Sequence, residues 1–429
     1  MTINIITLGC SKNTVDSEVL ASNYQKQGYT VLFEAAEDSD IVLINTCSFI
    51  QDAKEQSIEE IFTQIERKNR GEVKKVFVMG CLAQRYKDDL QKMIPEVDGI
   101  FSFAELPGML RIDKFNLLEK SDRLLSTPKH YAYLKVSEGC DRQCAFCAIP
   151  MIRGKQVSKP VGQLRDEAEL LVSKGVKEIM LIAQDLSNYG TDIDKRQQLD
   201  KLLESLAQVK GIEWIRLHYL FPINFPYEIL DVMNHYPQFC KYLDIPLQHI
   251  SENVLRSMNR PGTPVQLYKF IDTIREKVPG IAFRTTMLSG FPTETKADHK
   301  ELVKFIEDIR FERLGVFSYS REDDTPAFSL GDPVKKSEKK KRLEELMSVQ
   351  ENISFENNRR RVGTVLKVIV DAEEDEYYVG RTEFDSPEVD NLVLIDKKSP
   401  LEIGNFYPVH IQDADAFDLF GKVFYAESN

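Results

Sequence analysis

The middle of the chain repeats a short apolar run and then a helical pattern six times, from residue 131 to about residue 330. The apolar runs fall at 131–136, 178–182, 214–218, 242–245, 282–286 and 315–319, with helical patterns between them, for example at 161–174, 198–208 and 297–309. Continuous apolar runs are typical of buried parallel strands. Repeated strand–helix units with short loops predict a parallel sheet that curls into a full or partial βα barrel.

Residues 1 to about 105 also alternate strand and helix. We expect strands at 4–8, 40–45 and 75–79, and helices at 15–27 and 53–68. A cysteine follows each of these strands: Cys10, Cys47 and Cys81. Ligands of open α/β sheets bind at the carboxyl edge of the strands. Three thiols that are distant in sequence are therefore predicted to converge at one edge of an open parallel sheet.

The C-terminal part of the sequence does not continue the strand–helix repeat. Residues 335–361 are charged and predict a solvated connecting helix. Short β-rich runs follow at 365–370, 377–381, 392–395, 407–411 and 419–424, which predicts a small antiparallel barrel of oligonucleotide-binding type. The α/β chain thus divides into residues 1–115, 126–334, 335–361 and 362–429.

Length and composition favour a multidomain cytoplasmic protein. A chain of 429 residues is too long for one ordinary core. No apolar run is long enough for a membrane span, so no membrane partner is expected. The N-terminus has no basic region and no small-residue cleavage site. Thiols stay reduced in the cytoplasm, where clustered cysteines are more often metal ligands or catalytic groups than disulfides.

The net charge of −12 is spread unevenly. Residues 362–429 hold fifteen acidic and five basic residues, a balance of −10, which leaves −2 for the rest of the chain. An acidic module is a poor electrostatic partner for nucleic acid and a good one for a basic protein. The alternative is an acidic surface that only confers solubility.

The stretch EGCDRQCAFC, directly after the first barrel strand, places three thiols in eight residues: Cys140, Cys144 and Cys147. Structural zinc sites have four ligands, and no cysteine or histidine follows within twenty residues. Thiolates also hold clusters of four irons and four sulfurs, and three of them leave one iron open to an external ligand. A zinc loop in a non-catalytic RNA-binding protein remains the alternative from a different class.

Cys-x3-Cys-x-aromatic-Cys on the first strand of a βα barrel resembles the radical S-adenosylmethionine superfamily. The resemblance implies a [4Fe-4S] cluster held by these three cysteines. Its open iron binds S-adenosylmethionine, whose reductive cleavage gives a 5′-deoxyadenosyl radical. Phe146 would line the adenine. Gln184 and Asp185 follow the second barrel strand, where superfamily members contact the methionine amino group; ordinary loop polarity is the alternative for both.

With Cys10, Cys47 and Cys81 included, the whole chain resembles the methylthiotransferases. In that family three N-terminal cysteines hold a second [4Fe-4S] cluster, whose free iron takes the sulfur to be transferred. One S-adenosylmethionine methylates that sulfur and a second supplies the radical. The β-rich tail resembles the family's accessory TRAM-like barrel. The alternative for these three cysteines is that each is a small buried hydrophobe.

Several segments look most like the family branch that modifies a ribosomal protein: GCSKNTVDSE (9–18), CAFCAIPMIRGK (144–155) and LDIPLQHIS (243–251). The branch that modifies tRNA usually has Gln and Met-Asn where this chain has Ser11 and Lys12-Asn13. The acidic tail also favours a basic ribosomal protein over tRNA.

The resemblance then implies an enzyme that adds a methylthio group to the β-carbon of an aspartate. The substrate would be the twelfth small-subunit ribosomal protein, free or in the assembled subunit. A flavodoxin-like electron donor and a sulfur donor would be its other partners. The alternative is a 2-methylthiotransferase acting on a tRNA adenosine with an N6-isopentenyl or threonylcarbamoyl group.

Other residues carry weaker signals, and no catalytic residue is predicted beyond the cluster ligands. His218 and His249 lie at or near strand ends and are expected to be hydrogen-bonded core histidines. Cys240 has no partner at ligand spacing and is expected to be structural. Arg142 and Arg153 flank the cysteine loop and are candidates to steady a substrate carboxylate or the cluster.

Overall fold

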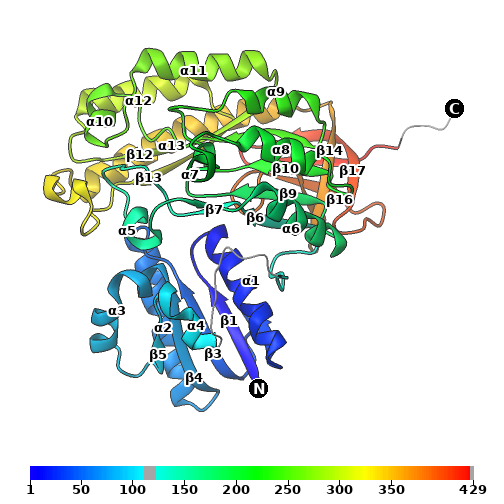
Figure 1. Cartoon of the computed structure of the whole chain (residues 1–429). Helices are drawn as coiled ribbons and strands as arrows, with labels where there is room; N and C mark the ends of the chain where they lie inside the picture. The colour runs from blue at the N-terminus through cyan, green and yellow to red at the C-terminus, as the bar shows by residue number, and fades with distance from the viewer. Residues whose placement is uncertain (111–121, 426–429) are drawn as a thin grey trace.

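The structure is a computed structural model that describes residues 1–110 and 122–425. The domain boundary expected at residue 115 and the last four residues of the chain lie outside this part. Figure 1 shows the N-terminal α/β unit below the open βα barrel, with the small C-terminal barrel (red) packed at the right of that barrel.

The N-terminal unit is a five-stranded parallel sheet of order β2-β1-β3-β4-β5. Its strands are β1 (Thr2–Thr7), β2 (Thr30–Phe33), β3 (Ser39–Thr46), β4 (Val73–Gly80) and β5 (Gly99–Ile100). The apolar side chains of α2 (Gln51–Asn69) and α3 (Cys81–Met93) pack on one face. Those of α1 (Ser11–Lys26) and α4 (Leu106–Leu110) pack on the other. The expected strands and helices are confirmed; β2, β5 and α3 were not expected.

The central unit is a six-stranded parallel sheet of order β13-β12-β11-β10-β9-β6, so its two end strands lie at opposite edges. This open arrangement confirms the partial barrel. Its strands are β6 (Tyr131–Lys135), β9 (Glu178–Ile182), β10 (Trp214–Leu217), β11 (Phe239–Asp244), β12 (Ala282–Ser289) and β13 (Arg313–Ser318). A short β7 (Ser137–Glu138) pairs with β8 (Val157–Ser158) beside the cysteine loop.

Helices cover the convex face of this sheet and form the main core with it. They are α6 (Val161–Ser173), α8 (Leu199–Ala207), α9 (Glu228–His235), α11 (Pro264–Lys277) and α12 (Lys296–Ile309), and shorter helices are α5 (Ile149–Arg153), α7 (Thr191–Asp194) and α10 (Glu252–Ser257). The starts of α11 and α12 are fixed by capping boxes from Thr263 and Thr295. The strands turn buried charged side chains, such as Lys135, Glu178 and Arg216, to the other face.

Helix α13 (Lys336–Arg359) lies where a connecting helix is expected, but it is not simply solvated. It packs along α12 and β13, and buries residues including Leu346, Gln350 and Ile353. The charged sequence concealed this packing because lysine and arginine stems cover apolar surface while their charged ends find polar partners. Lys339, for example, donates to the Tyr319 carbonyl at 2.7 Å.

The C-terminal strands close into a five-stranded barrel, as expected, of order β14-β15-β16-β18-β17. The barrel is not wholly antiparallel as predicted, because β16 and β18 pair in parallel: β17 lies between them in the chain but not in the sheet. They are β14 (Val365–Glu373), β15 (Tyr377–Thr382), β16 (Leu392–Asp396), β17 (Phe406–Ala414) and β18 (Asp418–Val423). The acidic residues are not all on its outer surface. Asp385 pairs with Arg313 (2.8 Å), Asp390 pairs with Arg284 (3.2 Å), and Asp371 pairs with Arg381 (2.6 Å) within the barrel. Some of the acidic residues thus dock the C-terminal domain on the central sheet. The acidic charge balance is therefore weaker evidence for a basic partner.

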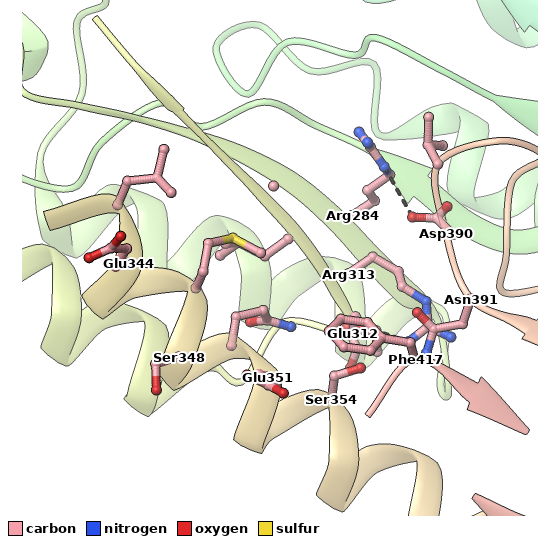
Figure 2. A pocket seen from close by; sticks show the side chains of 16 residues that line it. Arg284, Glu312, Arg313, Glu344, Ser348, Glu351, Ser354, Asp390, Asn391 and Phe417 are labelled. Carbon is pink, nitrogen blue, oxygen red and sulfur yellow. Dashed lines mark hydrogen bonds and ion pairs between the residues drawn. The ribbon is translucent and has the colours of Figure 1, made fainter. Parts of the chain in front are cut away.

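A pocket of about 530 Å³ lies between β13, α13 and the C-terminal domain. Figure 2 shows Arg284 and Asp390 facing one another beside it, with Ser348, Glu351 and Ser354 of α13 along another wall. The cysteines do not line this pocket. No helix within 1–110 and 122–425 is both long and apolar enough to cross a membrane.

Candidate active site

The three N-terminal cysteines lie at one edge of their sheet, as the strand pattern predicts. Cys10 directly precedes α1, Cys47 directly follows β3, and Cys81 begins α3 directly after β4. Gly9 has a φ of +99°, and a Cβ there would lie 2.8 Å from the Cys47 Sγ. Only glycine lets the first two cysteine segments approach this closely. The amide of Asn13 ties the same segments together by donating to the Thr46 carbonyl at 3.1 Å.

These thiols are near enough to influence one another's ionisation. Burial, with a smaller contribution from the neighbouring Cys10 and Cys81, raises the pKa of Cys47 to about 12. Burial also raises the pKa of Cys81, against the opposing effect of the Arg153 guanidinium. A buried thiolate needs a compensating cation, and a metal provides one.

The second set lies in the loop between β7 and α5. Gly139, just before Cys140, has a φ of +78°, and a Cβ there would overlap the carbonyl oxygen of Lys155. The backbone N–H of Cys140 donates to the Gly154 carbonyl at 3.1 Å. This close approach folds the loop back on itself and fixes where Cys140 lies.

Hydrogen-bond donors point at the sulfur atoms of this loop. Arg260 Nη1 lies 3.4 Å from the Cys144 Sγ, and the backbone N–H of Arg142 lies 3.4 Å from the Cys140 Sγ. Burial raises the pKa of Cys140 to about 11 and that of Cys147 to about 12. Donors to sulfur favour the thiolate form that binds metal. Sequence reasoning missed Arg260, because it lies more than a hundred residues from the loop and in no recognisable motif.

Gln184 and Asp185 lie beside the loop, and each has one acceptor atom that no donor among the described residues reaches. Gln184 Nε2 donates to Glu138 at 2.6 Å, and Arg142 Nε donates to Asp185 Oδ2 at 2.7 Å. Gln184 Oε1 and Asp185 Oδ1 are buried without a hydrogen-bond partner among the described residues. Unsatisfied buried acceptors are uncommon and fit an incoming donor such as an amine. Burial raises the pKa of Asp185, while Arg142 opposes the shift.

Phe146 is half-buried and packs against an apolar cluster that includes Phe291 and Tyr319, past the ends of β12 and β13. An aromatic face beside the cysteine loop is compatible with a nucleobase.

An ion cluster joins the two cysteine sets across the domain boundary. Arg153, at the end of α5, donates to Asp16 (2.6 Å) and Asn13 (2.7 Å) of α1, and its Nη2 lies 3.5 Å from the Cys81 Sγ. Lys135 binds Asp16 and also Glu138, the latter at 2.7 Å. Arg153 and Arg142 are thus engaged by protein carboxylates, which speaks against either as the receptor for a substrate carboxylate.

The remaining candidates are structural, as expected. His218 lies 3.1 Å from the Ser386 hydroxyl and 3.7 Å from Asp244, and burial lowers its pKa. His249 Nδ1 accepts from the Ser251 N–H at 3.0 Å. Cys240 is buried in an apolar cluster with Trp214.

Neither cysteine set is arranged around a single ion. In the part of the chain that the structure describes, no three His, Cys, Asp or Glu side chains are placed to hold one metal ion. The three thiolates of a cluster bind three different irons, so they lie farther apart than the ligands of one zinc ion.

Comparisons with known proteins agree with this architecture. Residues 2–102 match the "Uncharacterized protein family UPF0004", residues 134–306 match the radical SAM superfamily and residues 362–424 match the TRAM domain. The radical S-adenosylmethionine methyltransferase TsrM from Kitasatospora setae shares the fold, with a TM-score of 0.54 at 15% identity over 76% of each chain. The fold and its cysteine loop thus define a radical S-adenosylmethionine enzyme.

Relatives that align over nearly the whole chain identify the family more closely. The ribosomal protein uS12 methylthiotransferase RimO of Christiangramia forsetii is 50% identical over 98% of this chain and 94% of the relative. That of Cytophaga hutchinsonii is 49% identical over 98% and 97%. The chain belongs to the RimO family of methylthiotransferases.

Proposed function

We propose that this enzyme adds a methylthio group to the β-carbon of an aspartate in ribosomal protein uS12. The observation that carries the proposal is the pairing of two three-thiol sets across one domain boundary, joined through Arg153. A reaction that needs both a sulfur and a radical calls for two separate sites held at a fixed separation. The names and near-complete coverage of the relatives support uS12 as the substrate.

Cys140, Cys144 and Cys147 would hold one [4Fe-4S] cluster, and Cys10, Cys47 and Cys81 a second. When bound, the first cluster with S-adenosylmethionine supplies the radical, and the second carries the sulfur. The free acceptors Gln184 Oε1 and Asp185 Oδ1 would take hydrogen bonds from the methionine ammonium. Phe146 would lie against the adenine.

The surrounding residues keep this site rigid. Arg260 donates to the Cys144 sulfur, and Arg142 positions Asp185. Five of the six thiols are buried or half-buried, which limits the access of water to a reactive radical. The substrate would be met in the cytoplasm, as free uS12 or in the small subunit, with a flavodoxin-like reductant and a sulfur donor as further partners.

A paired mass comparison of cells with and without the gene tests the substrate. The intact mass of uS12 and a nucleoside digest of total tRNA are measured together. Loss of one methylthio group from uS12 alone is expected. Loss from a tRNA adenosine alone would transfer the enzyme to the tRNA-modifying branch, and no change in either would refute both substrates.

A further inference from the structure

Lys12 places a buried ammonium group at the domain boundary without a carboxylate partner. It lies in the first turn of α1, two residues after Cys10, and is 8% exposed. Its Nζ lies 3.1 Å from the centre of the Tyr219 ring. No carboxylate within 1–110 and 122–425 forms an ion pair with it. Asp16, one turn further along α1, is already bound by Lys135 and Arg153.

Fold stability does not explain this position. The N-terminus of a helix carries a partial positive charge, which disfavours a lysine in its first turn. Burial of most of a lysine side chain without a carboxylate partner is costly as well, and a contact with an aromatic face offsets only part of that cost. A cation kept in such a place is suited to receive an anion from outside the protein.

The segment after β10 locates the ammonium between the two cysteine sets. Tyr219 lies under Lys12 and has a left-handed backbone, with a φ of 61°. Two residues on, the Phe221 ring lies 4.1 Å from the Arg142 guanidinium and 4.2 Å from that of Arg260. Arg260 in turn contacts Cys144. One short segment thus touches Lys12 beside the first set and the arginines beside the second.

We propose that Lys12 binds the side-chain carboxylate of the substrate aspartate and so positions its β-carbon between the two sets. The inference rests on the proposed function and adds the group that recognises the substrate. The carboxylate is bonded directly to the β-carbon, so a cation that holds it controls where that carbon lies. Lysine also distinguishes aspartate from asparagine, because only the former brings a charge that compensates the buried ammonium.

S-adenosylmethionine also carries a carboxylate. The substrate is the favoured source of the carboxylate, because Lys12 belongs to the N-terminal domain, next to Cys10. Arg142 and Arg260, by contrast, lie beside the cysteine loop of the barrel, where S-adenosylmethionine would bind. The experiment separates the two sources of carboxylate.

The test measures binding of uS12, and of uS12 with its modified aspartate changed to asparagine, to the anaerobic holoenzyme. The wild type is expected to bind the aspartate form at least about tenfold more tightly. Lys12→Met should bind both forms equally, while Lys12→Arg should keep a preference for aspartate. Iron content and affinity for S-adenosylmethionine should match the wild type in both variants. Lys26→Met, on the exposed end of the same helix, is the matched control and should keep the full preference.

Three results would overturn the inference. Lys12→Met could retain the preference for aspartate, it could weaken S-adenosylmethionine binding instead, or both Lys12 variants could lose iron. In each case modification of uS12 by the wild type leaves the proposed function intact. If the wild type itself neither binds nor modifies uS12, the proposed function fails first and the inference fails with it.

Discussion

Arg153 Nη2 lies 3.5 Å from the Sγ of Cys81, so the helix that follows the barrel's cysteine loop directly contacts the N-terminal cysteine set. The same guanidinium binds Asp16 of α1 and Glu138 of β7. One buried side chain therefore links the N-terminal cysteine set to the strand that leads into the barrel's cysteine loop.

Replacement of Arg153 by Met should loosen the junction and lower the iron content. The change leaves Lys135 as the only cation that binds Asp16 and Glu138, and breaking a buried ion cluster typically costs about 3–5 kcal/mol. Thermal unfolding and iron per chain are the measurements. Arg165→Met, which removes an exposed pair with Glu169, should change neither. Equal behaviour of the two variants would show that Arg153 is dispensable.

The cysteines should divide into two independent sets. The anaerobically purified protein should be brown and contain about eight irons, and Cys144→Ala or Cys47→Ala should each remove about four. Iron analysis with electron paramagnetic resonance of the reduced protein tests this. Cys240→Ala, buried where the central sheet meets the C-terminal barrel, should keep all the iron. An unchanged iron content in Cys144→Ala would disprove the ligand assignment.

Two glycines, Gly139 at the start of the cysteine loop and Gly154 directly after α5, should differ sharply in their response to substitution. Gly139 and Gly154 have similar φ values of 78° and 77°, but a Cβ on Gly139 meets the Lys155 and Gly154 carbonyl groups, whereas one on Gly154 meets nothing. Gly139→Ala should displace Cys140 and remove about four irons. Gly154→Ala should cost only backbone strain, about 1–3 kcal/mol, and keep the iron. Similar iron loss in both variants would mean that backbone strain, and not overlap of the added Cβ with a carbonyl group, causes the loss.

The C-terminal domain should depend on one buried carboxylate. Glu178 of β9 binds Arg216 at 3.0 Å and Arg381 of the C-terminal barrel at 2.8 Å. Glu178→Gln leaves two buried guanidinium groups undercompensated, and should destabilise the docked domain by about 3–5 kcal/mol. Trp214, the only tryptophan, packs on Phe406 at this interface and reports the loss by fluorescence in denaturant.

The control for Glu178 is Lys398→Gln, which removes an exposed pair with Asp396 in the same barrel. It should shift the free energy of unfolding by less than about 0.5 kcal/mol. If Glu178→Gln had the same midpoint of denaturant unfolding as this control, Glu178 would have no role in docking the domain.

His249 should make stability depend on pH. Burial lowers its pKa to about 4, against about 6.5 in the unfolded chain. The unfolded state therefore binds a proton first as pH falls, so stability is lost between pH 6.5 and 4. From pH 7 to pH 5 the wild type should lose about 2 kcal/mol more than His249→Asn, which stays neutral. Urea unfolding at both pH values measures the difference, and parallel losses would contradict the assignment.

The local pattern of the sequence determined the strands, most helices and the placement of the cysteines. Buried parallel strands are continuous apolar runs, and the residue after such a strand necessarily lies at the carboxyl edge of the sheet. The spacing around Cys140 is also local, so the loop could be recognised directly. Strand β2 was not predicted because it is short and half-exposed, and β5 was not predicted because it is only two residues long.

Only the tertiary structure decided which distant charges meet. It brought Arg260 to Cys144, Arg153 to Cys81, and Lys12 to Tyr219. It also turned Asp385 and Asp390 inward, where the composition suggested an acidic surface. Most of these contacts join separate domains, and the partners in each lie far apart along the chain. Periodicity specifies which face of an element is buried, but the partner of a buried charge depends on how the folded domains pack together.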